Sequence, residues 1–91
     1  MELTEKQTKE LVKLIQQLVP KCTIYLMERK KENDVMIMLD NKGPIPFPTI
    51  LSIQEEIADN IPTFIGELID IFKTEEATKK AILEKGTKLT K

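Results

Sequence analysis

The chain has 91 residues, the length of one domain, and we predict that residues 1–91 form a single domain. Its 14 basic and 15 acidic residues leave a formal net charge of −1, so no overall charge draws it to nucleic acid or to an anionic membrane. With no histidine and one cysteine, the sequence excludes Cys–His metal sites, histidine-dependent catalytic pairs and an internal disulfide. The longest apolar run, at 35–39, is too short to span a bilayer, and we expect a cytoplasmic protein.

The first half of the chain predicts a helix followed by two strands. Apolar residues recur at helical spacing over 4–18, and Thr4 with Gln7 has the spacing of a capping box. Residues 22–27 and 34–40 are rich in β-branched and apolar residues, which is typical of strands. The charged turn at 28–33 is short, so we expect the two strands to pair antiparallel.

The second half predicts helix, strand and helix. A proline-rich loop at 44–48, with Phe47 turned inward, leads to a helix at 49–61; Ser52 and Glu55 also have capping-box spacing, which indicates a later start as an alternative. Residues 64–72 predict a third strand, and Thr74 is expected to cap a helix that ends at Gly86. The tail beyond it is expected to add a minor strand.

The resulting order, α-β-β-α-β-α, predicts an α/β protein of the α+β type. A crossover through a helix joins the second and third strands, and such a connection is typical of a parallel pair. We therefore expect a small, mixed, three-stranded sheet with helices on one face.

Five short segments occur in an order that resembles the minimal nucleotidyltransferases, small relatives within the DNA polymerase β superfamily. They are IYLM at 24–27, DVMI at 34–37, EEI at 55–57, GELIDI at 66–71 and ILEKGTKL at 82–89. The resemblance covers nearly the whole chain and implies the nucleotidyltransferase fold. It also implies where the phosphate-binding and magnesium-binding residues of the family would lie.

At those positions the chain departs from the family pattern. Glu28 and Arg29 replace the Gly-Ser turn that holds the nucleotide phosphates, and Met36 replaces the second aspartate of the Asp-x-Asp pair, leaving Asp34 and, further on, Glu67. A thioether does not bind magnesium usefully, so we predict a degenerate member with no catalytic residue, no metal and no cofactor. The alternative is a divergent nucleotidyltransferase or nucleotide-binding protein that keeps one magnesium ion on Asp34 and Glu67.

The sheet face that carries these positions is expected to be apolar. Residues two apart on a strand share a face, which places Met36 and Met38 beside Ile69 and Ile71. An uncovered apolar face is typical of an interaction site, so we predict a protein interface at these four residues. The alternative is that the proline-rich loop or the C-terminal tail covers the face.

A basic cluster at Arg29, Lys30 and Lys31 forms the other candidate contact, either with a phosphate or with an acidic partner. Glu28 and Glu32 flank the cluster and offset its charge, so a solvated hairpin tip is the simpler interpretation.

We interpret the chain as a binding protein rather than an enzyme: a pseudoenzyme with a nucleotidyltransferase-like fold that acts as a protein-interaction or regulatory module. Members of the family often work beside a small helical protein of the HEPN type, as in toxin–antitoxin pairs. The resemblance therefore implies an antitoxin-like role with a HEPN-type partner. Self-association into a homodimer is the other expected partnership, whereas neither a membrane nor nucleic acid is expected.

Overall fold

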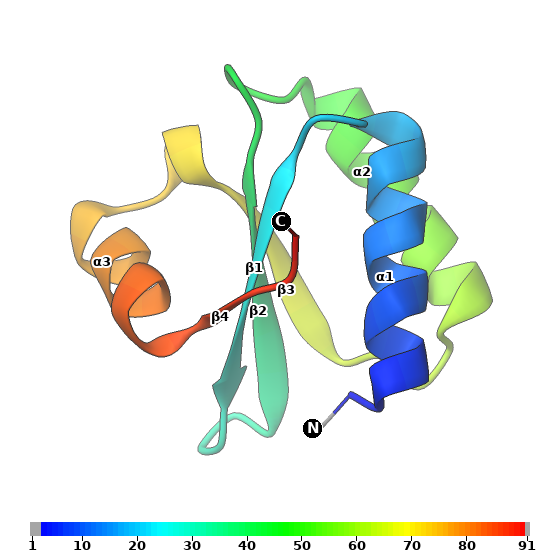
Figure 1. The fold of residues 1–91 in the computed structure, drawn as a ribbon, viewed down its shortest axis with the longest axis horizontal. Helices are drawn as coiled ribbons and strands as arrows, with labels where there is room; N and C mark the ends of the chain where they lie inside the picture. Colours follow the sequence, from blue (N-terminus) through cyan, green and yellow to red (C-terminus); the bar gives the residue numbers. More distant parts are fainter. Residues whose placement is uncertain (1–2, 91) are drawn as a thin grey trace.

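A four-stranded mixed sheet forms the centre of the molecule, and helices pack on both of its faces (Figure 1). The computed structural model describes residues 3–90. Its elements are α1 (Glu5–Leu18), β1 (Thr23–Arg29), β2 (Asp34–Asp40), α2 (Phe47–Asn60), β3 (Gly66–Asp70), a 3-10 helix (Ile71–Lys73), α3 (Glu76–Lys85) and β4 (Thr87–Lys88). None of the described helices is long and apolar enough to cross a membrane.

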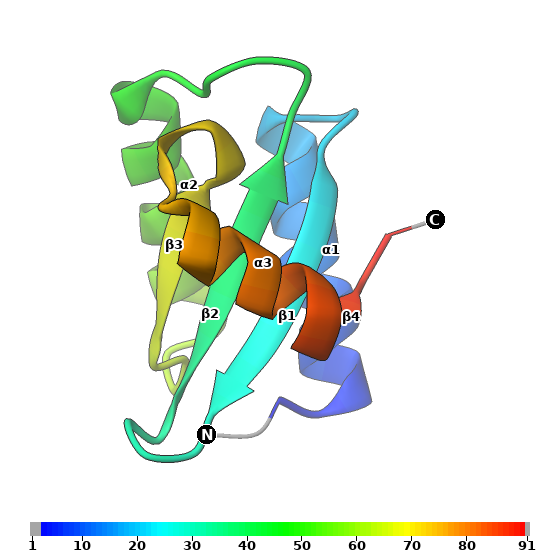
Figure 2. The same cartoon turned by 90° about the vertical axis from the view of Figure 1, so that its left-hand side faces the viewer.

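The strands lie in the order β3-β2-β1-β4, as Figure 2 shows from the side of α3. β1 pairs antiparallel with both β2 and β4, and β2 pairs parallel with β3. The mixed α/β fold predicted from the sequence is therefore confirmed. The sheet has four strands and not the three predicted, because the minor strand expected in the tail forms as β4 and joins it.

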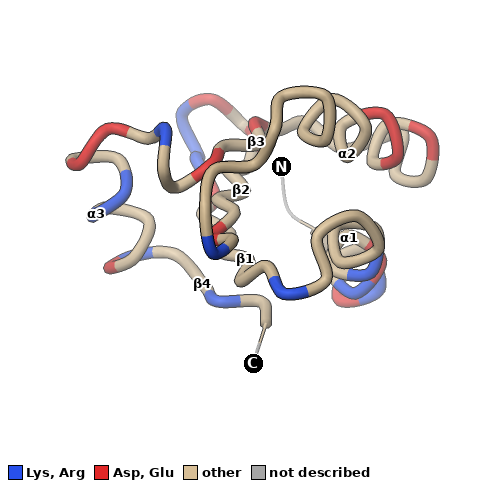
Figure 3. The backbone as a smooth tube through the Cα atoms, turned by 90° about the horizontal axis from the view of Figure 1, so that it is seen from above, with Lys and Arg blue, Asp and Glu red and all other residues tan. Residues whose placement is uncertain are grey.

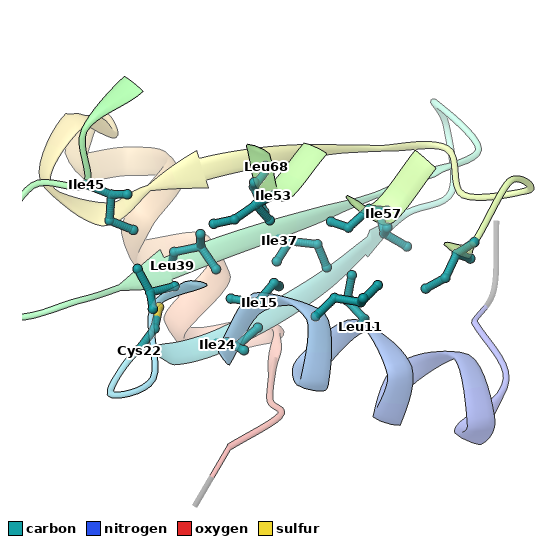
Figure 4. Packing of buried hydrophobic residues seen from close by; sticks show 14 residues of the cluster. Leu11, Ile15, Cys22, Ile24, Ile37, Leu39, Ile45, Ile53, Ile57 and Leu68 are labelled. Atoms are coloured by element: carbon teal, nitrogen blue, oxygen red, sulfur yellow. The ribbon is translucent and has the colours of Figure 1, made fainter. Parts of the chain in front are cut away.

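The expectation that all helices lie on one face was also wrong. Helices α1 and α2 cover one face of the sheet, and α3 crosses the other (Figures 1 and 2). The larger core lies between α1, α2 and the sheet, and Figure 4 shows its closely packed side chains. Its fully buried members include Leu11, Ile15, Ile24, Val35, Ile37, Leu39, Ile45 and Ile53. A smaller cluster under α3 is built on Met36, Met38 and Ile82.

The helix boundaries follow from local hydrogen bonds. The capping box of α1 forms as predicted, since the Gln7 N–H donates to Thr4 Oγ1 and the Thr4 N–H donates to Gln7 Oε1, each at 3.0 Å. For α2, the alternative of a later start, suggested by the spacing of Ser52 and Glu55, was wrong. The helix begins at Phe47, where the fixed φ of proline suits a first turn, and the Ser52 hydroxyl donates to the Pro48 carbonyl at 3.0 Å instead of capping.

Asp70 ends β3 earlier than the sequence predicted. Its Oδ1 accepts the Phe72 N–H at 3.0 Å, which turns the chain into the 3-10 helix. The Thr74 hydroxyl donates to the Asp70 carbonyl at 2.6 Å, so Thr74 closes this corner and does not cap α3. Glu75 is the N-cap residue of α3, and Gly86 is its C-cap residue, as predicted.

Candidate functional site

The hairpin turn between β1 and β2 sets the geometry of the candidate site. Asn33 adopts φ 54°, a left-handed conformation that asparagine tolerates better than most residues. The resulting register pairs Arg29 with Asp34, and Met27 with Met36. The parallel ladder then places Glu67 beside Met36. Asp34, Met36 and Glu67, the three positions at which the family resemblance places metal ligands, therefore share one corner of the sheet, and Arg29 joins them.

The Arg29 guanidinium lies between the two carboxylates of this corner. Its Nε donates to Asp34 Oδ1 at 2.8 Å and its Nη2 donates to Asp34 Oδ2 at 2.5 Å, which is the bidentate geometry of a strong arginine–carboxylate pair. The same Nη2 lies 3.6 Å from Glu67 Oε2. One protein cation therefore contacts both of the carboxylates that the alternative hypothesis assigns to magnesium.

This ion pair fixes the charge state of the corner. The hydrogen bond from Arg29 holds the pKa of the Asp34 carboxyl below its usual value, and the Asp34 carboxylate raises the pKa of Arg29. Both groups are therefore charged at neutral pH. Sequence reasoning placed Arg29 with the hairpin tip. In the structure Lys30 and Lys31 are exposed there, whereas Arg29 belongs to the strand. Opposite charges flanking a short turn were the signal for this cross-strand pair.

The position of the family's phosphate-binding turn is occupied by regular strand. β1 continues through Arg29, and its last two residues, Glu28 and Arg29, pair with Val35 and Asp34. A phosphate cradle needs successive backbone N–H groups that converge on one point, commonly with glycine at the closest approach. A paired strand alternates the direction of these groups, and the side chains of Glu28 and Arg29 point to opposite faces of the sheet.

The donor set at this corner does not fit a magnesium site. Met36 supplies a thioether, and the two carboxylates already contact a guanidinium. Within residues 3–90, no group of three or more histidine, cysteine, aspartate or glutamate residues is placed to hold a metal ion.

An open pocket of about 540 Å³ adjoins this corner. Arg29, Met36 and Glu67 form one wall, and Phe47 from the start of α2 and Lys73 from the 3-10 helix lie across from them. The Lys73 ammonium donates to the Ile45 carbonyl at 3.2 Å. Arg29 is therefore ion-paired within the pocket, whereas Lys73 donates to a neutral carbonyl and, among residues 3–90, forms no ion pair.

The sheet face predicted to be an open interface is largely covered. Met36 and Met38 are 7% and 0% exposed, because Ile82 of α3 packs against them. Ile69 and Ile71 are half-buried in the same cluster. The prediction of an uncovered face was therefore wrong for the two methionines. The cover is α3, and not the proline-rich loop or the tail considered as the alternative.

Sequence reasoning missed two further features. Asp70 is buried, and its Oδ2 accepts the Ile45 N–H at 2.8 Å, so this carboxylate ties the proline-rich loop to the end of β3. Phe47 was expected to turn inward, yet it is 57% exposed and Ile45 is the buried member of the loop. Both features depend on where the chain turns after β2, and an isolated stretch of prolines does not specify that direction.

Searches with the sequence and with the structure give different results. No protein-family model matches the chain, and a search of curated proteins also finds no match. Several solved structures share its fold.

The complex of tri-AMPylated Shewanella oneidensis HEPN toxin with MNT antitoxin matches with a TM-score of 0.81 and 16% identity, over 97% of this chain and 72% of that chain. The toxin–antitoxin MntA–HepT matches with a TM-score of 0.79 and 16% identity, over 96% and 72% of the two chains. A toxin–antitoxin with AMP-PNP matches with a TM-score of 0.76 and 16% identity, over 91% and 72%. At this identity the likeness establishes the fold, which is that of the MNT nucleotidyltransferase-like structures.

Proposed function

We propose that this chain is a degenerate nucleotidyltransferase-fold protein that has lost catalysis and acts by binding another protein, in the manner of an antitoxin. The observation that carries the proposal is the position of the Arg29 guanidinium, which contacts Asp34 and Glu67 where the family would hold magnesium. Nucleotidyl transfer depends on metal ions that neutralise the charge developing on the phosphates. The Arg29 guanidinium supplies positive charge, but, unlike a metal ion, it has no open coordination position that a phosphate oxygen could take.

The strand geometry supports the same conclusion for the nucleotide. A triphosphate approaching this corner would meet regular strand in place of a phosphate-binding turn, because β1 continues through Arg29. Glu28 pairs with Val35 and so points to the other face of the sheet, and the exposed carboxylate at the corner is that of Glu67, whose side chain is 54% exposed. Electrostatic repulsion and the missing cradle therefore act together against ATP.

The partner class is supported by the structures that share the fold. Two of them are described as complexes of a toxin with an antitoxin, HEPN with MNT and HepT with MntA. We therefore propose a helical HEPN-type protein as the partner of this chain, with a homodimer as the other candidate. A regulatory role needs a stable binding surface and no catalytic metal, so it is compatible with the ion pair between Arg29 and Asp34 at this corner.

Affinity capture followed by a transfer assay tests both halves of the proposal. The tagged chain is used to purify partners from a lysate of its source, and a HEPN-type protein is expected in stoichiometric amount. The purified pair is then incubated with magnesium and ATP labelled at the α-phosphate, and no label is expected on either protein. Label transferred by the wild type and lost in Asp34→Ala would instead establish the divergent enzyme. Failure to capture any HEPN-type protein would remove the antitoxin-like role.

A further inference from the structure

Helix α2 carries a second apolar stripe that faces away from the core. The first stripe, Ile53 and Ile57 with Ile61 just beyond the helix, is buried against the sheet. The second follows the spacing 47, 51, 54 and 58, which places four side chains on one side of a helix: the apolar Phe47, Leu51 and Ala58, with the polar Gln54 among them. Phe47 and Leu51 in this stripe are 57% and 44% exposed, so two large apolar side chains are in contact with water.

The exposed stripe continues onto the edge of the sheet. β3 is the outermost strand on its side, next to α2 (Figure 2). A shallow pocket of about 210 Å³ lies between the two elements and is lined by Gln54 and Ala58 from α2 and by Gly66 and Leu68 from β3. Leu68 also lines the larger pocket that Phe47 borders. We define the α2–β3 surface as Phe47, Leu51, Gln54, Ala58, Gly66 and Leu68.

Helix α2 carries charge of one sign, whereas Arg29 and Lys73 line the pocket at its Phe47 end. The sequence has no lysine or arginine between Lys42 and Lys73. The ionisable residues of α2 are Glu55, Glu56 and Asp59, and Figure 3 shows the helix with red segments and no blue. Among residues 3–90, no basic group forms an ion pair with any of these three carboxylates. The apolar stripe is therefore bordered by uncompensated negative charge.

From these features we infer that the α2–β3 surface binds a protein whose contacting face presents apolar side chains bordered by lysine and arginine. Apolar contact with Phe47 and Leu51 would supply affinity, and the basic border would meet Glu55 and Asp59, which lie beside this row on the helix. The inference rests on the proposed protein-binding function and specifies the surface and the chemistry of the partner.

The same charges argue against a second copy of this chain as the occupant. In a symmetric dimer each copy contributes the same patch, so the contact would contain the α2 carboxylates of both copies and no cation from α2 or β3. Like charges held close together in a partly desolvated contact repel each other. The partner of this surface is therefore a different protein.

The test uses two synthetic amphipathic helical peptides with leucines at the same positions, one with lysine and one with glutamate at every polar position. Binding to the purified full chain is measured by fluorescence anisotropy of a labelled peptide. The lysine peptide is expected to bind, and Leu51→Ser is expected to weaken it by about ten-fold, the effect of losing one buried leucine contact. Leu83→Ser is the matched control, because Leu83 is 48% exposed on α3 and lies outside the surface.

Equal binding of the glutamate peptide, or equal effects of Leu51→Ser and Leu83→Ser, would overturn the inference. So would sedimentation showing a wild-type dimer that Leu51→Ser converts to a monomer, because the occupant would then be a second copy. Circular dichroism of each variant confirms that it is folded. A HEPN-type partner that binds wild type and Leu51→Ser equally would remove this surface and leave the proposed function standing. Lack of a captured partner, with the peptide results as expected, would remove the antitoxin-like role alone.

Discussion

Truncating Ile82 to alanine tests whether α3 is a packed part of the fold. Ile82 is fully buried against Met36 and Met38, and it is the one buried residue of α3. The substitution removes three carbon atoms, worth about 2.5 kcal/mol at ~0.8 kcal/mol for each buried methylene. The cavity left behind adds to this, so we expect the free energy of unfolding to fall by about 3 kcal/mol. That is a large part of the roughly 5–14 kcal/mol typical of a domain of this length.

The assay is urea unfolding followed by circular dichroism, with amide hydrogen exchange of the helix as a second measurement. Leu83→Ala is the control, since Leu83 is the next residue of α3 and is 48% exposed; its expected cost is below about 1 kcal/mol. Exchange of the α3 amides should become about 100-fold faster in Ile82→Ala. If the two variants lose the same stability and exchange alike, α3 does not pack on the sheet, and the methionine face would again be a candidate interface.

Three further predictions concern the other buried features. Asp70→Ala leaves two backbone N–H groups without their acceptor and should cost about 3 kcal/mol in urea unfolding, whereas Asp59→Ala, at an exposed carboxylate, should cost little. Burial raises the pKa of the Cys22 thiol from 9.0 to about 11, so stability present below pH 9 should decline between about pH 9 and 11, and Cys22→Ala should remove that part of the decline. A Cβ at Gly86 would lie 2.5 Å from a carbonyl oxygen, so Gly86→Ala should lower the unfolding midpoint by the equivalent of about 1–3 kcal/mol, while Gly43→Ala, with open space around it, should not.

The elements with a strong local signal could be predicted from the sequence. The capping box and apolar spacing define α1, and the alternation of β2 separates Val35, Ile37 and Leu39 from Met36 and Met38 exactly as the two cores require. The fold class followed from the ordered set of segments, because order and spacing reflect topology. These features depend on neighbours in the chain.

The features that could not be predicted depend on contacts between distant segments. α3 buries a single residue, so its sequence pattern does not show which face of the sheet it covers. A minor strand was expected in the tail, but the two residues of β4 are too few to show from the sequence that it joins the sheet beside β1. The spacing of Ser52 and Glu55 resembles that of a helix start, but α2 begins earlier, with Pro46 as its N-cap residue and Pro48 in its first turn. For the site, the residue types were visible in the sequence, whereas the contact between Arg29 and Glu67 required the parallel pairing of β2 with β3.

The ion pair also explains how two carboxylates can lie close together at this corner of the sheet. Two carboxylates on one sheet face repel each other unless a cation lies between them. Arg29 supplies that cation from the adjacent strand and contacts both Asp34 and Glu67. The chain itself therefore offsets one of the two negative charges at this corner.

Isothermal titration of the chain with magnesium and ATP tests most directly the proposal that Arg29 stands where the family holds magnesium. We expect no saturable heat with the wild type at millimolar ATP, and none with Asp34→Ala. Saturable binding to the wild type that disappears in Asp34→Ala would contradict the proposal, because the carboxylate would then be holding a metal–nucleotide complex in spite of its guanidinium partner.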